Sequence, residues 1–81
     1  MTTCKISQFG LLVIDKARKR KGWTKYDLAW IHAAYTSRST LWRFWSRKKI
    51  CHETFIAICN AVNINWQDVV EKDASEKNSF K

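Results

Sequence analysis

Hydrophobic side chains recur at helical spacing in the first part of the chain. Across residues 7–21 the apolar positions of one face oppose lysines and arginines, and Gly22 then offers the left-handed conformation that ends a helix. A second helix is expected over residues 24–33, because Thr24 and Asp27 have the spacing of a capping box ahead of an apolar stripe. The pattern therefore predicts two helices with a very short connection.

Three further helices are expected in the rest of the chain. Ser37 is a suitable cap for a helix over residues 38–45, which a short turn separates from the preceding helix. A broad apolar stripe begins near His52, and Asn65 is the cap of a short last helix. Residues 73–81 are polar, and a flexible C-terminal tail is expected there.

Composition favours one small helical domain. The 81 residues are 46% hydrophobic, with no proline and two glycines, which favours helices over a turn-rich sandwich. We predict an all-α fold, a compact bundle of about five short helices over residues 1–72, with a helix-turn-helix formed by the second and third helices. A chain this short has little room for a deep cleft and offers no evident nucleophile–base pair, phosphate-binding glycine loop or carboxylate cluster, so no enzyme is predicted.

Five tryptophans are many for a core of this size. The large side chains that we assign to the core are Trp23, Leu28, Leu41, Phe44, Phe55, Ile58 and Trp66. Trp30, Trp42 and Trp45 cannot all be buried as well. Any that is exposed would form a surface for a partner or a wedge between base steps.

Positive charge is concentrated in the middle of the chain. The net charge is +8, and residues 16–49 hold eleven lysines or arginines against one acid, Asp27. A solvated basic face is the ordinary explanation of such a run. Because this run brackets the expected helix 38–45, nucleic acid becomes the favoured explanation.

The three cysteines are odd in number and lack a paired close spacing, which indicates reduced thiols in a cytoplasmic protein. Zinc is the alternative, because His52 adjoins Cys51 and His32 lies upstream, but the usual ligand spacings are missing. No metal or cofactor is therefore expected. The apolar run 9–14 is too short to span a bilayer and no leader peptide is evident, so no membrane association is expected.

Several segments in order carry a resemblance to a known family. They are residues 14–18 (IDKAR) with 21–23 (KGW), 24–29 (TKYDLA), 37–44 (SRSTLWRF) and 55–66 (FIAICNAVNINW). Together they resemble the Cro/C1-type (Xre-like) helix-turn-helix family of phage repressors and bacterial regulators, over about residues 9–71. The resemblance implies a sequence-specific DNA-binding transcriptional regulator that reads the major groove with helix 38–45.

The chain departs from that family at three points. The spacing from Leu28 to Leu41 is about two residues longer than in compact members, and Lys25 stands where the family often has a phosphate-bonding glutamine. Trp42 and Trp45 occupy positions that are commonly polar or acidic in the family. Similar-looking modules also occur at the N-termini of multidomain bacterial signalling NTPases. The alternative function is therefore a helical protein–protein interaction module, an adaptor or the N-terminal module of a larger bacterial signalling assembly.

The expected contacts to double-stranded DNA follow from helix 38–45. The residues assigned to base reading are Arg38, Ser39, Trp42 and Arg43, and those assigned to phosphates are Lys25, Thr40, Arg47, Lys48 and Lys49. Lys25 is expected at the amino end of the second helix, beside its free amides. Arg18 is expected to pair with an internal carboxylate such as Asp68 or Glu71 rather than to touch DNA.

Helix 7–21 carries more apolar surface than one core can cover. Phe9, Leu12 and Val13 fall off the face that Leu11 and Ile14 share. They are candidates for a homodimer or protein-partner surface, which would suit the reading of two half-sites. The alternative is that residues 1–6 or the C-terminal segment fold back over them.

Overall fold

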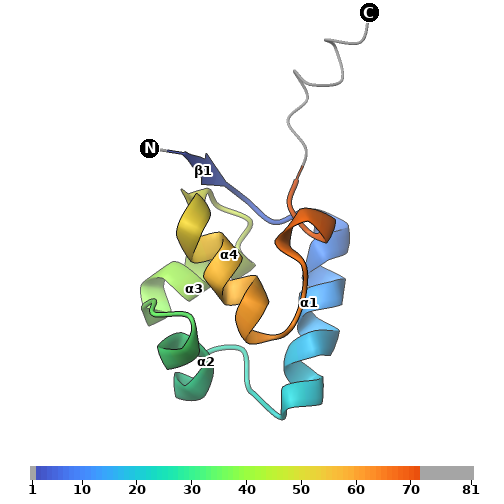
Figure 1. Cartoon of the computed structure of the whole chain (residues 1–81), viewed down its shortest axis with the longest axis vertical. Coiled ribbons are helices and arrows are strands. Elements are labelled where there is room, and N and C mark those ends of the chain that lie inside the picture. The colour runs from blue at the N-terminus through green and yellow to red at the C-terminus, as the bar shows by residue number, and fades with distance from the viewer. Residues whose placement is uncertain (1, 72–81) are drawn as a thin grey trace, which may run out of the picture.

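The computed structural model describes residues 2–71 of the chain. Four α-helices, two short strands and one 3₁₀ turn follow one another in the order β1 (Thr3–Cys4), α1 (Gln8–Lys21), α2 (Leu28–Ala33), α3 (Arg38–Trp45), β2 (Ile50–Cys51), α4 (His52–Ala61) and η1 (Trp66–Asp68). In Figure 1, α4 crosses in front of α3, α2 lies below them, and α1 stands on the opposite side beside η1. The predicted tail, 73–81, lies outside the described residues.

The prediction of an all-α bundle of five helices is wrong. β1 pairs with β2 in an antiparallel ribbon, in which Thr3 faces Cys51, and a further bridge joins Ile6 to Val70. The expected fifth helix is a single 3₁₀ turn that Asn65 caps, its Oδ1 accepting from the Gln67 amide at 3.0 Å. The chain leaves the helical path there because its backbone pairs instead with the N-terminal lead-in, as in the Glu71 N–H bond to the Lys5 carbonyl at 2.8 Å.

The ends of α1 are as predicted. The Ser7 hydroxyl accepts from the Gly10 amide at 2.9 Å, and Gly22 adopts a left-handed conformation with φ of 77°. Gly10 also allows α1 to approach the η1 segment closely, because a Cβ at this position would lie 2.5 Å from the Val69 carbonyl oxygen. No helical periodicity in the sequence indicates this second role.

The second helix starts later than predicted. Asp27, and not Thr24, is its cap: one Asp27 carboxylate oxygen accepts from the Ala29 amide at 3.0 Å and the other from the Thr24 amide at 3.2 Å. Leu28 is consequently the first helical residue and is 68% exposed, so its assignment to the core is wrong. Trp23 stacks on Trp30, with ring centroids 6.2 Å apart.

The core is centred on one tryptophan. Trp30 is fully buried, its indole Nε1 donates to the Ile58 carbonyl at 3.2 Å, and the rings of Phe44 and Trp45 pack edge-on against it. Trp45 is half-buried and Trp42 remains 50% exposed, which confirms that these three tryptophans are not all buried. The core therefore leaves one large apolar side chain of α3 at the surface.

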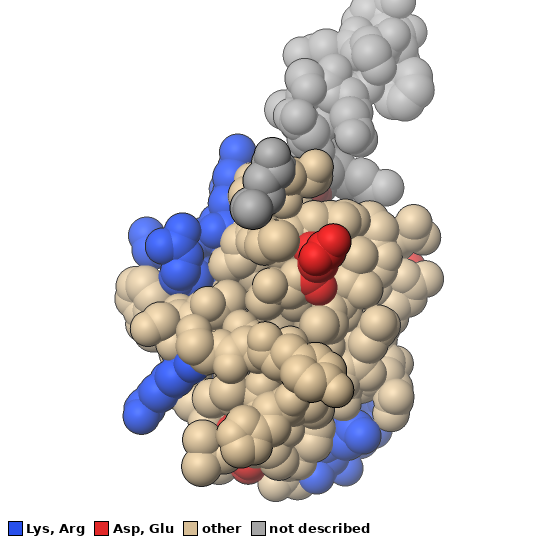
Figure 2. Space-filling model, turned by 60° about the vertical axis from the view of Figure 1, so that its left-hand side comes forward, with Lys and Arg blue, Asp and Glu red and all other residues tan. Residues whose placement is uncertain are grey.

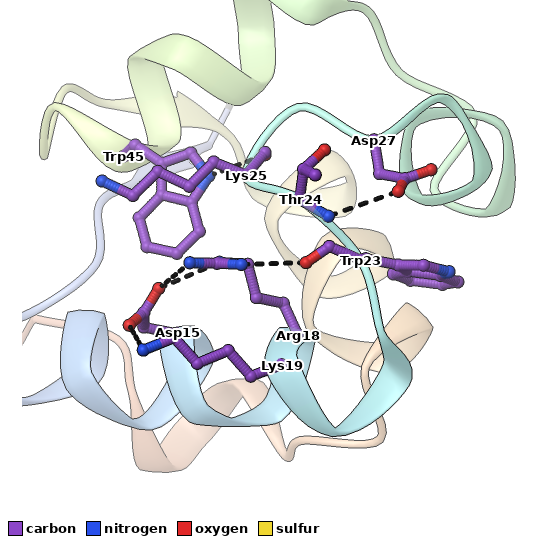
Figure 3. A network of polar contacts seen from close by, with 8 residues as sticks. All are labelled: Asp15, Arg18, Lys19, Trp23, Thr24, Lys25, Asp27 and Trp45. Carbon is purple, nitrogen blue, oxygen red and sulfur yellow. Dashed lines mark hydrogen bonds and ion pairs between the residues drawn. The ribbon is translucent and has the colours of Figure 1, made fainter.

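A polar network holds α1 against the connection to α2 (Figure 3). Arg18 donates to the Asp15 carboxylate at 2.9 Å and to the Trp23 carbonyl at 2.8 Å, and Lys19 lies 3.4 Å from the same carboxylate. The structural role expected for Arg18 is confirmed, although its acid is Asp15 rather than a C-terminal carboxylate. The Trp45 indole then ties α3 to this connection by donating to the Lys25 carbonyl at 3.1 Å.

Candidate nucleic-acid interface

The outward face of α3 forms one side of a surface groove. Ser37 caps the helix as predicted, because its hydroxyl accepts from the Thr40 amide at 3.2 Å, and Leu41 and Phe44 anchor the helix in the core. The opposite face lies in solvent. Its residues line a shallow groove of about 500 Å³, which we call the α3 groove, formed by Tyr26, Arg38, Ser39, Trp42 and Arg43.

The structure thus brings together all four residues predicted to read bases. Tyr26, which the sequence did not single out, completes the groove. It lies in the connection ahead of α2, because that helix starts at Leu28 rather than at residue 24. No local sequence signal marks Tyr26, since its position depends on where the neighbouring helix begins.

Positive side chains lie over aromatic rings around α3. The Arg38 guanidinium carbon is 5.5 Å from the centroid of Tyr26, and the ammonium of Lys48 is 5.9 Å from that of Trp42. Lys25 lies in the same way over Trp45, at 5.1 Å. Each such contact contributes about 0.5–1 kcal/mol at an exposed site. The cations are therefore oriented along α3 while they remain accessible to a ligand.

Three of the residues assigned to phosphates are lysines that do not line the groove. Lys25, Lys48 and Lys49 are all exposed. Lys25 does not lie at the first turn of α2 as expected, and the amide of Ala29 in that turn is already bonded to Asp27. A phosphate contact at this position would therefore rest on the Lys25 ammonium alone.

Two residues assigned to phosphates are engaged within the molecule. Arg47 donates to the Ile6 carbonyl at 3.1 Å and forms an ion pair with Glu71, which fastens the end of α3 to both terminal segments. Thr40 is half-buried and its hydroxyl accepts from the Ser37 hydroxyl at 3.1 Å. Arg47 is occupied by these contacts, so we leave it out of the proposed interface, whereas the Thr40 hydroxyl accepts in its bond and keeps its own hydrogen to donate.

The charges are not spread evenly over the surface. Figure 2 shows lysine and arginine side chains projecting from the margins of the view, around a centre that is uncharged except for one acidic side chain. The five residues of the α3 groove include two arginines and no acid. Arg43 gives one guanidinium donor to the Lys49 carbonyl at 3.3 Å, and its other donors can face a ligand.

Two of the three candidate partner residues on α1 are exposed. Phe9 and Leu12 are 67% and 65% exposed, whereas Val13 is half-buried and packs against the core. Residues 2–6 do not cover this surface, because they run along β2 and the Val70 segment instead. Phe9 and Leu12 therefore form a small apolar patch on α1, remote in sequence from the α3 groove.

The cysteines are free thiols. Burial raises the pKa of the Cys4 thiol, with a further contribution from Cys51, and the Cys4 sulfur lies 3.7 Å from His52 Nδ1. Burial raises the pKa of Cys59 to about 12. Within residues 2–71 no three histidine, cysteine or acidic side chains are close enough to hold a metal ion. The raised pKa of the Cys4 and Cys59 thiols is opposite to the lowered pKa that activates a cysteine nucleophile.

Comparison with known proteins gives one distant relative. An uncharacterized WD repeat-containing protein from Nostoc sp. (strain PCC 7120 / SAG 25.82 / UTEX 2576) is 31% identical over an alignment of 88 residues, which covers 88% of this chain and 7% of that protein. No family model matches the chain, and no solved structure matches it. In the part of the chain that the structure describes, none of the helices has the length and apolar character required to cross a membrane.

Proposed function

We propose that this protein binds double-stranded DNA through the α3 groove and acts as a transcriptional regulator. The observation that carries the proposal is the composition of that groove, in which Arg38, Ser39 and Arg43 share one exposed helix face. Arginine reads guanine by donating to its O6 and N7 atoms, and a serine hydroxyl can bond to either class of base. The α3 face thus offers hydrogen-bond donors that suit the edges of bases, and no carboxylate lines the groove to repel DNA.

The size of α3 suits the major groove. An α-helix with its side chains is about 10–12 Å in diameter, which matches the major-groove width of about 12 Å, and the eight residues of α3 would lie within that groove. Lys48 and Lys49 follow the helix directly, and Lys25 lies on the neighbouring connection, next to Trp45. With α3 in the groove, these lysines are the side chains that would neutralise flanking phosphates.

The proposal includes a cytoplasmic location and no cofactor. DNA is in the cytoplasm of a bacterium, and the free cysteines suit a reducing compartment. A homodimer through Phe9 and Leu12 would present two copies of α3, and a two-fold dimer reads half-sites about 34 Å apart.

A second candidate function is a protein–protein interaction module. Two observations favour it: the exposed apolar patch on α1, and the similarity to a stretch that forms only 7% of a larger WD repeat-containing protein. In this function the chain would serve as an adaptor or as the N-terminal module of a larger assembly. Its α3 groove would then contact a protein or remain in solvent.

A titration against random-sequence duplex DNA at two salt concentrations separates these functions. Logarithmic affinity should fall with logarithmic salt concentration with a slope of about −0.9 for each phosphate neutralised. If the three lysines make these contacts, the slope should be about −3 and Lys25→Ala should make it shallower by about 1. Lys16→Ala on α1 is the matched control, because it removes an equal charge from an exposed residue that has no place in the proposed interface.

Sequence preference is tested with a selected duplex and a random one. Arg38→Ala and Arg43→Ala should each cost about 1–3 kcal/mol on the selected duplex and less on the random one. Equal losses on both would mean that the arginines contact phosphate only. No binding of the wild-type protein even in dilute salt would contradict the proposed function and favour the interaction module.

A further inference from the structure

Trp42 is the unusual component of the α3 groove. Half of its surface is exposed, although it lies on the same face as two arginines and a serine. Burying an apolar side chain stabilises a protein by about 25 cal/mol for each Å² removed from water, so an exposed indole gives up part of that gain. Contact with an apolar group of a ligand in the groove would recover that gain.

A cation lies beside each aromatic ring of the groove. The Lys48 ammonium lies 5.9 Å from the indole centroid, yet Lys48 is not among the residues that line the groove. Tyr26, the other aromatic residue of the groove, has the Arg38 guanidinium 5.5 Å from its ring centroid. The groove thus has an apolar part, made of two aromatic rings, between charged side chains.

Only one group on the major-groove edge of DNA matches an apolar surface. The edges of guanine, adenine and unmodified cytosine present hydrogen-bond donors and acceptors, whereas thymine adds a methyl group at C5. A methyl group at the same carbon of cytosine occupies the equivalent place on its ring. An indole ring face satisfies neither a donor nor an acceptor, but it can cover a methyl group.

We propose that the α3 groove binds the C5 methyl group of a pyrimidine, which packs against Trp42. This inference rests on the proposed function, since it requires duplex DNA at α3. Arg38 and Arg43 flank the indole along the helix and would read guanines at neighbouring positions. Thymine and 5-methylcytosine supply the same methyl group, and the experiment below distinguishes them.

Four repeating duplexes test the proposal without knowledge of an operator. They are alternating A·T, the same duplex with deoxyuridine in place of thymidine, alternating G·C, and the same duplex with 5-methylcytosine. Fluorescence anisotropy at low salt gives the affinity for each. Burying one methyl group corresponds to about fourfold in affinity, the equivalent of about 0.8 kcal/mol, so each methylated duplex should bind about fourfold more tightly than its partner.

Variants of Trp42 connect this preference to the indole. Trp42→Gln, which replaces the indole by a polar chain, should bring the methylated-to-unmethylated ratio close to one, and Trp42→Phe should retain most of it. Leu28→Ala is the matched control: it shortens another exposed apolar side chain that does not line the groove, so the ratio should remain at about four. Because half of Trp42 is already in solvent, both Trp42 variants should fold, and circular dichroism checks this.

Each outcome is decisive. A preference in the A·T pair alone assigns the groove to thymine, a preference in the G·C pair alone assigns it to 5-methylcytosine, and a preference in both pairs assigns it to the methyl group in either base. Equal affinity of the wild-type protein for the members of both pairs would overturn the inference while leaving DNA binding intact. A ratio that persists in Trp42→Gln would also overturn it, because the methyl group would then act elsewhere or through DNA shape. Absence of binding to all four duplexes would instead be a failure of the proposed function.

Discussion

Tyr35 should limit the stability of this protein, and its replacement by glycine should raise it. Tyr35 follows α2 in the turn to α3 with φ of 52°, and its side chain is 93% exposed. A left-handed conformation costs an L-residue other than glycine about 1–2 kcal/mol. With so little of its side chain in contact, Tyr35 has almost no packing to offset that cost.

The size of the effect follows from two opposing contributions. Tyr35→Gly removes the strain of about 1–2 kcal/mol but gives the unfolded chain extra freedom, which costs about 0.4–1 kcal/mol. The expected net gain in the free energy of unfolding is about 0.5–1 kcal/mol. For a domain of this size that corresponds to a Tm increase of about 2–8 °C. Urea and thermal unfolding monitored by circular dichroism measure both quantities.

Other left-handed residues provide the controls. Asn63 has φ of 62°, and because asparagine tolerates this conformation, Asn63→Gly should change stability less than Tyr35→Gly does. Arg47 has φ of 59°, but Arg47→Gly also removes the bond to Ile6 and the ion pair with Glu71, so a net loss is expected. A Tyr35→Gly protein less stable than wild type would refute the reasoning, since it would mean that the tyrosine side chain contributes more than its backbone costs.

Three further outcomes are expected. Leu12→Glu should leave the fold intact and weaken self-association in sedimentation experiments, because Leu12 is exposed; a wild-type protein that is monomeric at high concentration, alone and on DNA, would exclude the dimer. Cys59 has its pKa raised to about 12 by burial, so iodoacetamide should label it in mass spectra only after unfolding; labelling of the folded protein would contradict this. Partial burial raises the pKa of Asp15, but its bonds to Arg18 and Lys19 outweigh this and lower it below 3.8. Its contribution is therefore present above about pH 4 and is lost as the pH falls through the lowered pKa, so Asp15→Asn should reduce the acid sensitivity of unfolding, and an unchanged pH profile would contradict the pairing.

Helix ends that depend on nearby residues were predictable from the sequence. Ser7, Gly22 and Ser37 act within one or two turns of their own position, and each has the role that its residue type indicates. The start of α2 was predicted wrongly, because Thr24 and Asp27 satisfy the same capping pattern in two different ways. The sequence contains both residues but does not decide which of them caps.

The strands and the shortened last helix could not be predicted in this way. Thr3 pairs with Cys51, and Ile6 with Val70, across most of the chain. Such short strands have no periodicity of their own, since two residues cannot show an alternation. The backbone of the Val70 segment is satisfied by the N-terminal lead-in, and helical propensity after Asn65 is overridden by this pairing.

The α3 groove was predictable only in part, because helical spacing places four of its residues and tertiary packing places the fifth. Arg38, Ser39, Trp42 and Arg43 share a face by helical spacing alone, so any helix over 38–45 brings them together. Tyr26 joins them only through tertiary packing. The same packing engages Arg47, whose charge the sequence suggested for phosphate, in holding the end of α3 to Ile6 and Glu71.

The fastening of α3 has a consequence for how tightly one domain can bind DNA. Arg47 is engaged in the fold, so of the four charged residues predicted to contact phosphates only Lys25, Lys48 and Lys49 keep an uncommitted charge. Three contacts support a modest, salt-sensitive affinity, because the phosphate contacts supply a large share of protein–DNA binding energy. In return, Arg47 and the Trp45 bond to Lys25 both hold the carboxyl end of α3, which would fix the groove before a ligand arrives. A binding site with few charges would gain most affinity from a second copy of the domain or from a second binding site in a longer chain. Linking two binding sites raises the overall affinity without adding a contact to either site.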